Sequence, residues 1–459
     1  MSAAPLDTNA VLEKMHGRTL PAGLAIGAVV VMIIGLAGFL YGLFANPAWA
    51  WGAYLTALVW ILAVAQGGVL FSIMLTLTWG RWGRPLKRIG EAFGLFLPVG
   101  YLLLLVFLLA GNAIYPWHDG TILERVDLAP HSAQAIATKE IWLDLPFFIA
   151  RHVVGFGLLI GLSLLYVRAS LRPDLIQATA FLRQKHPSWS PPGWWSWFTG
   201  GAGALDEELR TNQHRQSVLG LVVALLYTVI FSMMAFDLIM SLVPWWYTNM
   251  FGGWIFVSSF WVSLAVLGIF GLLSRDWLGI TPWVNKTVTH DLGKLVLAFC
   301  MFWAYTLFSQ LLPIWYANIP EETVFLLVRL FLPEWTWLTY TVGVLCFLTP
   351  FTVLVSRGIK KMKWPFIMIL TIICVGVFLE RTLLVMPSVY FGGTFPVDLF
   401  LLVSIPVWLG FVAAFALVVS AVLAKLPPLV VSDPALLPHP WDVHVRALAD
   451  VQEHRELQT

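Results

Sequence analysis

Residues Asn285 to Glu322 read NKTVTHDLGKLVLAFCMFWAYTLFSQLLPIWYANIPEE, and they contain an apolar helix long enough to cross a membrane. Polar and aromatic side chains interrupt it, whereas contact with lipid alone would require only Leu, Ile, Val and Phe. Such side chains on a spanning helix indicate that one face meets protein, water or a ligand. The predicted polar face of this helix comprises Tyr305, Ser309, Gln310 and Tyr316.

The composition of the whole chain places it in the membrane. The 459 residues are 59% hydrophobic and 11% charged, whereas soluble proteins carry about 25% charged residues. Apolar runs of spanning length recur, so we predict an all-α integral membrane protein with about ten helices. The predicted spans are 21–44, 51–79, 90–114, 146–168, 217–243, 250–274, 292–316, 334–356, 364–386 and 399–424; Pro333 and Pro350 interrupt the neighbourhood of the eighth.

The distribution of Lys and Arg predicts the orientation of these helices. Most basic residues fall on one side of a ten-helix topology, and the positive-inside rule makes that side, with both termini, cytoplasmic. Arg84, Lys87 and Arg88 are explained by this rule, and the net charge of +2 indicates no nucleic-acid partner. The predicted organisation is a cytoplasmic segment 1–20, helices one to four in 21–168, a cytoplasmic loop 169–216, helices five to ten in 217–424 and a cytoplasmic tail 425–459.

Ionisable residues inside the predicted spans are candidates for function because burying them in a membrane is costly. One reading is a quinone-headgroup or proton site in the outer half of the membrane, because His, carboxylates and Arg supply the required donors and acceptors. The other is a set of buried ion pairs that fix helix packing, such as Asp237 with Arg151 or Arg381. The outer candidates are Asp144, Arg151, His152, Asp237, Glu321, Glu322, Glu380 and Arg381.

One pair of outer candidates and a separate group at the cytoplasmic boundary can also be interpreted structurally. For Glu380 and Arg381 a packing role is favoured, since adjacent residues point to different faces of a helix. At the cytoplasmic boundary, His290, Asp291 and Lys294 are candidates for proton entry. His290 and Asp291 are also interpretable as a helix N-terminal feature, because an acidic residue in a first turn complements the helix dipole.

Redox centres are not expected in this chain. Cys300, Cys346 and Cys374 stand singly and form no metal-binding or haem-attachment motif. A haem between helices needs two facing histidines, and His152 alone lies convincingly within a span. We therefore predict no haem and no metal cluster, so that partner subunits would hold the redox centres of any electron-transfer assembly.

Two helices carry a family resemblance. The motif SMMAFDLIMSLVPWWYTNMFGGWIF (Ser232–Phe256), followed by HDLGKLVLAFCMFWAYTLFSQLLPIWYANIPEET (His290–Thr323), resembles the ActF subunit of bacterial alternative complex III, an NrfD-like polytopic membrane protein. Further similarity lies in LDLPFFIAR (Leu143–Arg151) and in VMPSVYFGG after the ninth helix. The similarity spans roughly residues 50–425. The residues that match are Asp144, Arg151, Asp237, His290, Asp291, Ser309, Gln310, Tyr316, Glu321 and Glu322.

The resemblance implies a ten-helix protein with two four-helix bundles and two peripheral helices, in a bacterial inner membrane. It implies membership of a respiratory quinol:cytochrome c oxidoreductase, in which this subunit binds quinone or quinol, conducts protons or serves as a scaffold. The implied partners are a second NrfD-like membrane subunit, a periplasmic iron–sulfur protein and a multihaem cytochrome c, which hold the clusters and haems. Surrounding lipid is a further partner, and the catalytic label belongs to the complex.

Two readings of other kinds stay open. A proton-coupled secondary transporter would use the buried carboxylates, but it predicts inverted repeats with broken helices in corresponding positions, and none is evident in the sequence. A purely structural anchor for peripheral redox subunits would use the same polar residues for helix packing. Adjacent genes for iron–sulfur and multihaem proteins would favour the complex or the anchor over the transporter.

Overall fold

The computed structural model describes residues 8–118, 139, 141–390 and 394–433, and within these ranges every regular element is helical. Ten helices in these ranges are long and apolar enough to span a membrane, which confirms the predicted all-α, multi-pass architecture. Six spans are unbroken or nearly so: α2 (Ala22–Ala45), α3 (Pro47–Leu77), α7 (Leu145–Lys185), α10 (Met250–Leu278), α11 (Lys286–Ala317) and α15 (Lys363–Val389).

The other four spans change helical form along their length. One is divided between α4 (Arg84–Gly94) and α5 (Leu97–Ala110), where Pro98 follows the break. The remaining three contain a π-helical turn, a form that is rare and is found frequently at functional sites. They are α9 (Leu205–Met234) with η4 (Ala235–Ile239) and η5 (Met240–Leu242); α13 (Pro333–Gly343) with η6 (Val344–Leu348) and α14 (Thr349–Val355); and α16 (Val397–Leu399) with η8 (Phe400–Ser404) and α17 (Ile405–Leu423).

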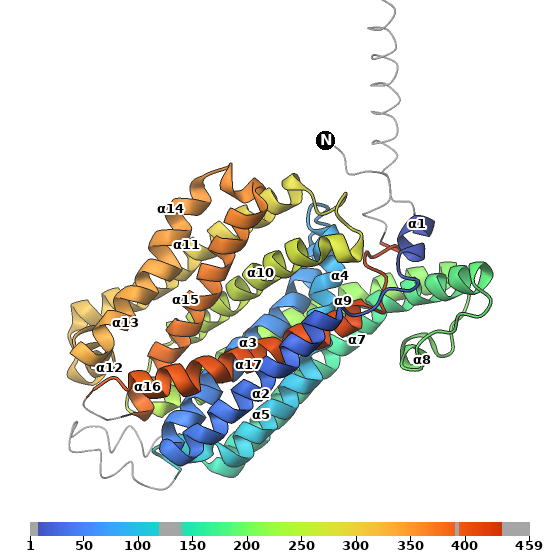
Figure 1. The fold of residues 1–459 in the computed structure, drawn as a ribbon. Coiled ribbons are helices and arrows are strands. Elements are labelled where there is room, and N and C mark those ends of the chain that lie inside the picture. The colour runs from blue at the N-terminus through green and yellow to red at the C-terminus, as the bar shows by residue number, and fades with distance from the viewer. Residues whose placement is uncertain (1–7, 119–138, 140, 391–393, 434–459) are drawn as a thin grey trace, which may run out of the picture.

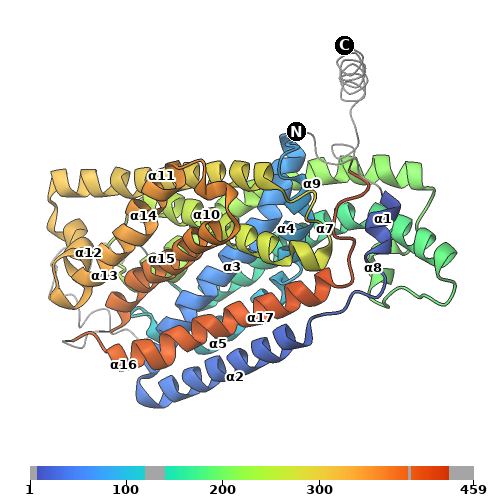
Figure 2. The ribbon, with the colours of Figure 1, turned by 45° about the horizontal axis from the view of Figure 1, so that its top comes forward.

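The helices form two groups of four and one peripheral pair. The first bundle contains α3, α4 with α5, α7 and α9, and the second contains α10, α11, α13 with α14, and α15. Contacts of α3 with both α10 and α15 join the two bundles, and α3 is buried along most of its length. The pair α2 and α17 packs side by side along the first bundle (Figures 1 and 2).

Short elements mark the two ends of the bundles. Helix α1 (Thr8–Glu13) and the chain after α17 lie at one end, called the α1 end below. Helix α12 (Pro320–Leu330), which follows α11 in the chain, lies with α16 at the opposite end, called the α12 end (Figures 1 and 2). The helix α12 was not among the predicted elements.

The predicted loop 169–216 is mostly helical. Helix α7 continues through Pro173 to Lys185 and α9 begins at Leu205, so that the irregular part between them contains only the short helix α8 (Trp195–Thr199). Arg172 joins the two extensions, since its Nε and Nη2 donate to the carboxylate of Glu208 at 2.7 and 2.8 Å. The spanning helices therefore project beyond their apolar segments and are held together by this charged pair.

Candidate functional site

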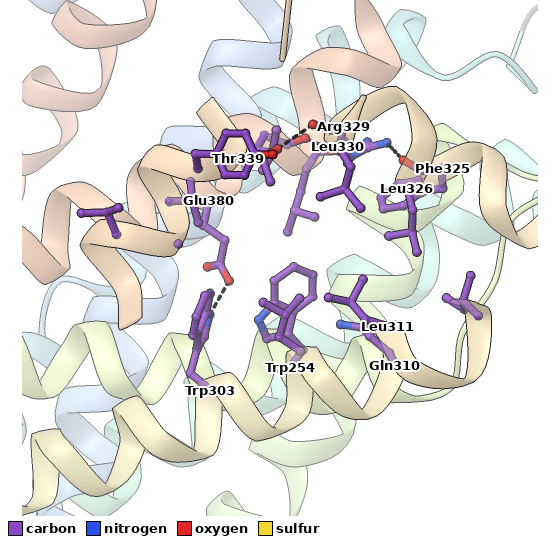
Figure 3. Close-up of a pocket in the computed structure, with 18 of the residues that line it drawn as sticks. Trp254, Trp303, Gln310, Leu311, Phe325, Leu326, Arg329, Leu330, Thr339 and Glu380 are labelled. Atoms are coloured by element: carbon purple, nitrogen blue, oxygen red, sulfur yellow. Dashed lines mark hydrogen bonds between the residues drawn. The ribbon is translucent and has the colours of Figure 1, made fainter. Parts of the chain in front are cut away.

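A cavity of about 430 Å³ lies in the second bundle towards the α12 end, between α11, α12, α13 and α15 (Figure 3). Its volume is in the range of pockets that hold small-molecule ligands, which are typically ~300–1,000 Å³. The wall is mostly aliphatic and aromatic, and its polar members are few. The lining residues include Trp246, Trp254, Trp303, Leu307, Gln310, Leu311, Phe325, Leu326, Arg329, Leu330, Thr339, Gly343, Glu380 and Leu383.

Three polar groups on the cavity wall have no hydrogen-bond partner among the described residues. Both atoms of the Gln310 carboxamide are unpaired although the side chain is only 5% exposed. The indole Nε1 atoms of Trp246 and Trp254 are unpaired as well. Buried polar groups are normally hydrogen-bonded, so this wall offers donors and one acceptor to a ligand that enters the cavity. Figure 3 shows Gln310 and Trp254 on one side of the cavity and Arg329 and Thr339 on the other.

The cavity wall also carries a buried carboxylate, that of Glu380. Its Oε1 accepts a 2.6 Å hydrogen bond from Trp303 Nε1, drawn in Figure 3, and its Oε2 accepts one of 2.7 Å from Arg381 Nη1. Arg381 also donates to Ser258 Oγ at 2.7 Å. Glu380 and Arg381 are adjacent in α15 and reach partners on different helices, Trp303 of α11 and Ser258 of α10, yet their charged ends meet in a buried ion pair.

Arg329 closes the cavity opposite Trp303. Its Nε donates to the carbonyl of Leu383 at 3.0 Å and its Nη2 donates to Leu384 O and Ser388 Oγ. The Leu383 carbonyl needs an outside donor because residue 387, four positions later in α15, is a proline without an N–H. Arg329 thus replaces a missing helix hydrogen bond. Its guanidinium also lies over the Phe325 ring, whose centroid is 3.4 Å away.

A second polar cluster surrounds Asp237 in the π-helical turn η4 at the α12 end of the first bundle. Arg151 Nε donates to Asp237 Oδ2 at 2.7 Å, which is one of the two pairings expected for Asp237. Trp142 Nε1 donates to Asp237 Oδ1 at 2.7 Å, and His152 Nε2 lies 3.7 Å from Oδ2. A pocket of about 260 Å³ adjoins this cluster, and Trp246 lines both it and the larger cavity.

The remaining outer candidates do not join either cluster. Asp144 is exposed and caps α7, because its Oδ2 accepts a 3.0 Å hydrogen bond from the Phe147 N–H. Glu322 is half-buried in the first turn of α12. The side chain of Glu321 lies outside what the structure describes.

The four residues predicted to form the polar face of the seventh spanning helix, α11, do not share one environment in the structure. Gln310 points inward with Trp303, whereas Tyr305 and Tyr316 are 63% and 84% exposed. Ser309, one position before Gln310, is half-buried and does not line the cavity. One of the four predicted residues therefore belongs to the candidate site.

A third cluster lies in the first bundle at the α1 end, and its charged members are fully buried. Arg88 Nη1 donates to Glu91 Oε2 at 2.6 Å, and Nη2 donates to Asp174 Oδ2. Glu91 Oε1 accepts hydrogen bonds from Ser72 and Ser170 at 2.9 and 2.6 Å. Ser72 Oγ in turn lies 2.9 Å from the Tyr166 hydroxyl, which lies 2.9 Å from Thr76 Oγ1. The result is a continuous hydrogen-bonded chain of side chains from Asp174 to Thr76.

The chain segment after α17 covers this third cluster. The backbone N–H groups of Val431 and Ser432 donate to Asp174 at 3.2 and 2.8 Å, and Asp433 accepts from Arg84 and Lys87. We call residues 426–433 the C-terminal strap. A polar pocket of about 180 Å³ beside the strap is lined by Thr76, Arg84, Lys87, Gln213, Gln216, Ser432 and Asp433. Orientation alone therefore does not explain Arg84, Lys87 and Arg88, because all three are buried in specific ion pairs.

The residues proposed for proton entry lie apart from that buried network. Asp291 and Lys294 form a 2.6 Å ion pair near the surface of α11, and His290 is half-buried beside them. Asn285 caps the helix by accepting from Thr287 N and Val288 N. The interpretation of Asp291 as a first-turn residue is wrong, since it lies in the second turn after this cap.

Sequence reasoning did not assign Trp142, Trp246, Trp254, Arg329, Asp174 or Tyr166 to a site. The proline at 387 was the one local signal for Arg329, because it leaves a carbonyl without its donor. No protein-family model matches this sequence, and no curated protein matches it either.

Proposed function

We propose that this chain is an NrfD-like membrane subunit of a respiratory quinol:cytochrome c oxidoreductase, embedded in a bacterial inner membrane with both termini cytoplasmic. In this proposal the subunit binds a quinone or quinol ring and provides parts of a proton path. Partner subunits, namely a second NrfD-like membrane protein, an iron–sulfur protein and a multihaem cytochrome c, hold the redox centres.

The cavity between α11, α12, α13 and α15 is the observation that carries this proposal. A quinone ring is flat and apolar with two oxygen atoms at opposite edges, so it needs an apolar pocket and a few hydrogen-bonding groups. The unpaired carboxamide of Gln310 and the unpaired indole N–H groups of Trp246 and Trp254 supply those groups. Glu380 adds a carboxylate on the same wall.

The oxidation of a quinol to a quinone releases two protons and two electrons. The electrons would pass to the iron–sulfur and haem centres of the partners, and Glu380 is placed to accept a proton. The Asp237 cluster adjoins the same cavity through Trp246. It would offer a second acceptor and an exit towards the α12 end, which faces outward in the proposed topology.

The chain of side chains from Asp174 to Thr76 supports proton entry at the opposite end. It reaches the polar pocket beside the C-terminal strap, and the proposed topology places that pocket at the cytoplasmic surface. Apolar rings, including Phe156 and Phe231, lie in the first bundle between this chain and His152. Protons would therefore enter through this network and leave through the Asp237 cluster, with an apolar barrier between the two.

Gly343 offers a direct test, since it lines the cavity and a Cβ built on it meets no atom within 4 Å. In the intact complex, Gly343→Leu should occupy part of the ligand space, and its Cβ would meet no neighbour. We expect it to raise the KM for a soluble quinol by about tenfold or more, which corresponds to ~1.4 kcal/mol. Gly161→Leu is the matched control, because Gly161 is a spanning-helix glycine with equally open surroundings outside the cavity.

A photoreactive quinone gives an independent readout of the same cavity. Labelled peptides should come from α11 or α12 in the wild type, and Gly343→Leu should abolish this labelling while the partner subunits still co-purify. Unchanged labelling and turnover in Gly343→Leu would show that the quinone binds elsewhere. Purification of the chain without any haem or iron–sulfur partner, from membranes that retain such complexes, would instead favour the transporter.

A further inference from the structure

A second large cavity lies at the α1 end, between α2, α10, α15 and α17. Its volume is about 460 Å³, and its wall is formed mainly by apolar and aromatic side chains such as Phe270, Trp408 and Phe415. Leu24 and Leu273 line it and are 40% and 51% exposed, so the cavity opens to the lipid-facing surface of the helices. A molecule that occupies this cavity would therefore enter it from the membrane.

Most polar atoms on this wall are already hydrogen-bonded, and an exception is the indole Nε1 of Trp408, which has no partner among the described residues. Ser274 Oγ donates to Phe270 O at 2.6 Å, Thr371 Oγ1 donates to Ile367 O at 2.9 Å, and Trp60 Nε1 donates to Cys374 O at 3.2 Å. Neither a carboxylate nor a carboxamide side chain belongs to the described lining. This cavity therefore suits a hydrocarbon chain. The cavity between α11, α12, α13 and α15, in contrast, has a carboxylate and a carboxamide on its wall.

A buried arginine lies beside the Trp277 edge of the cavity. The Arg18 guanidinium is 5.8 Å from the Trp277 ring centroid, and Trp277 lines the cavity and donates to Thr19 O at 3.1 Å. Arg18 Nη2 donates to the carbonyls of Leu423 and Leu426. Its Nε and Nη1 have no partner among the described residues although the side chain is only 9% exposed. An arginine whose donors are unsatisfied favours an anionic oxygen ligand.

Further basic side chains surround the same edge. Lys14 Nζ donates to the carbonyl of Gly279 at 3.2 Å, on the turn that ends α10. Arg275 and Lys363 lie 3.9 and 3.5 Å from the carboxylate of Asp276. Lys14, at the turn that ends α10, and Arg275 and Lys363, beside Asp276, thus add positive charge near this edge, and the excess over Asp276 complements an anionic headgroup.

We propose that this cavity is a binding site for an anionic phospholipid, with an acyl chain between α2, α10, α15 and α17 and the phosphate at Arg18 and Lys14. The apolar wall, the lipid-facing opening and the cluster of cations at one edge together match a molecule with a long hydrocarbon chain and a negative head. Because Arg18 also donates to the carbonyl of Leu423 and to that of Leu426, the first residue of the C-terminal strap, the bound lipid would stabilise this strap. The site is independent of the proposed quinone chemistry.

The test uses the full chain purified in a neutral detergent after removal of lipid. Phosphatidylglycerol, phosphatidylcholine and inorganic phosphate are titrated separately and bound species are counted by native mass spectrometry. We expect phosphatidylglycerol to bind preferentially, and we expect Lys14→Gln and Arg18→Gln each to weaken it about fivefold, since a basic residue near a lipid surface is worth ~1 kcal/mol. Arg18→Lys should retain most of the binding because the charge remains.

A variant that fills the cavity separates a lipid from a free anion. Ala416→Phe places a ring in the acyl-chain space, whereas Leu36→Phe is a control on the exposed face of α2. Loss of phosphatidylglycerol in Ala416→Phe but not in Leu36→Phe supports the proposal. Equal affinities for the two phospholipids, an effect of inorganic phosphate equal to that of the lipid, or displacement of a quinone by Ala416→Phe would each overturn it.

Discussion

The indole N–H of Trp303 donates a 2.6 Å hydrogen bond to Oε1 of Glu380, on the opposite side of that carboxylate from Arg381. Glu380 is 1% exposed, so these two donors take the place of water around its carboxylate. Held in this way, the carboxylate remains on the wall of the 430 Å³ cavity between α11, α12, α13 and α15. Glu380 is therefore both a member of a structural ion pair and a candidate functional group.

Breaking this ion pair from one side should cost more than removing both charges. Arg381→Met leaves Glu380 buried without its cation, and we expect a loss of about 3–5 kcal/mol in the free energy of unfolding. Glu380→Gln combined with Arg381→Met should restore a substantial part of that loss. Thermal unfolding in detergent, monitored by tryptophan fluorescence, shows whether the double variant is more stable than Arg381→Met alone. Equal destabilisation in the single and double variants would contradict the pairing.

Arg329 and Pro387 should be energetically coupled. Arg329→Lys removes the fork that reaches Leu383 O, Leu384 O and Ser388 Oγ, and we expect it to cost about 1–3 kcal/mol through unsatisfied buried acceptors. In a Pro387→Ala background the helix supplies its own donor to Leu383 O, so the same change should cost less. A double-mutant cycle of unfolding free energies measures this coupling. Strict additivity would show that Arg329 does not compensate for the proline.

The close approach of α2 to α17 depends on Gly35. A Cβ at Gly35 would lie 2.7 Å from Pro406 O and 2.9 Å from the Gly410 Cα, distances that real side chains do not adopt. Gly35→Leu should separate the two helices and lower the free energy of unfolding by about 1–3 kcal/mol. Gly27→Leu, on the same helix with no atom within 4 Å, is the matched control. Similar thermal stability of the two variants would contradict close backbone packing.

Asp174 should determine whether the C-terminal strap stays bound. Asp174→Ala removes the acceptor of the Val431 and Ser432 N–H groups and leaves Arg88 with one carboxylate. Loss of these hydrogen bonds should raise the open population of the strap about tenfold or more. The rate of tryptic cleavage after Lys425 reports that population. Asp206→Ala, at an exposed position in α9, should leave the rate unchanged.

The fold class could be predicted from the sequence because it depends on the hydrophobicity of local segments. Ten apolar runs, each about as long as a bilayer is thick, are sufficient for ten helices, because backbone groups in a membrane must be satisfied within a helix. The apolar run also predicts the eighth span at 334–356, close to the observed Pro333–Val355 despite its prolines. It could not predict the extensions of α7 and α9, since charged residues outside the apolar runs are equally compatible with loops.

Only part of the candidate site followed from the sequence. The cost of burying charge identified Asp237, Arg151, His152, Glu380 and Arg381 as residues that need partners. Which partners they have depends on helices far apart in the chain, such as Trp303 for Glu380 and Trp142 for Asp237. Gln310 and Tyr305 looked equivalent along their helix, yet one lines a cavity and the other is exposed.

The sequence by itself determined that this protein is a bundle of spanning helices and which of its charges had to be neutralised inside it, because both follow from the transfer of local segments out of water. The tertiary structure decided which side chains meet, where a cavity remains between them and which polar groups on its wall are left unpaired. Those outcomes depend on the rotation and spacing of helices against one another, and these are set by packing between distant segments such as the glycine contact of α2 with α17.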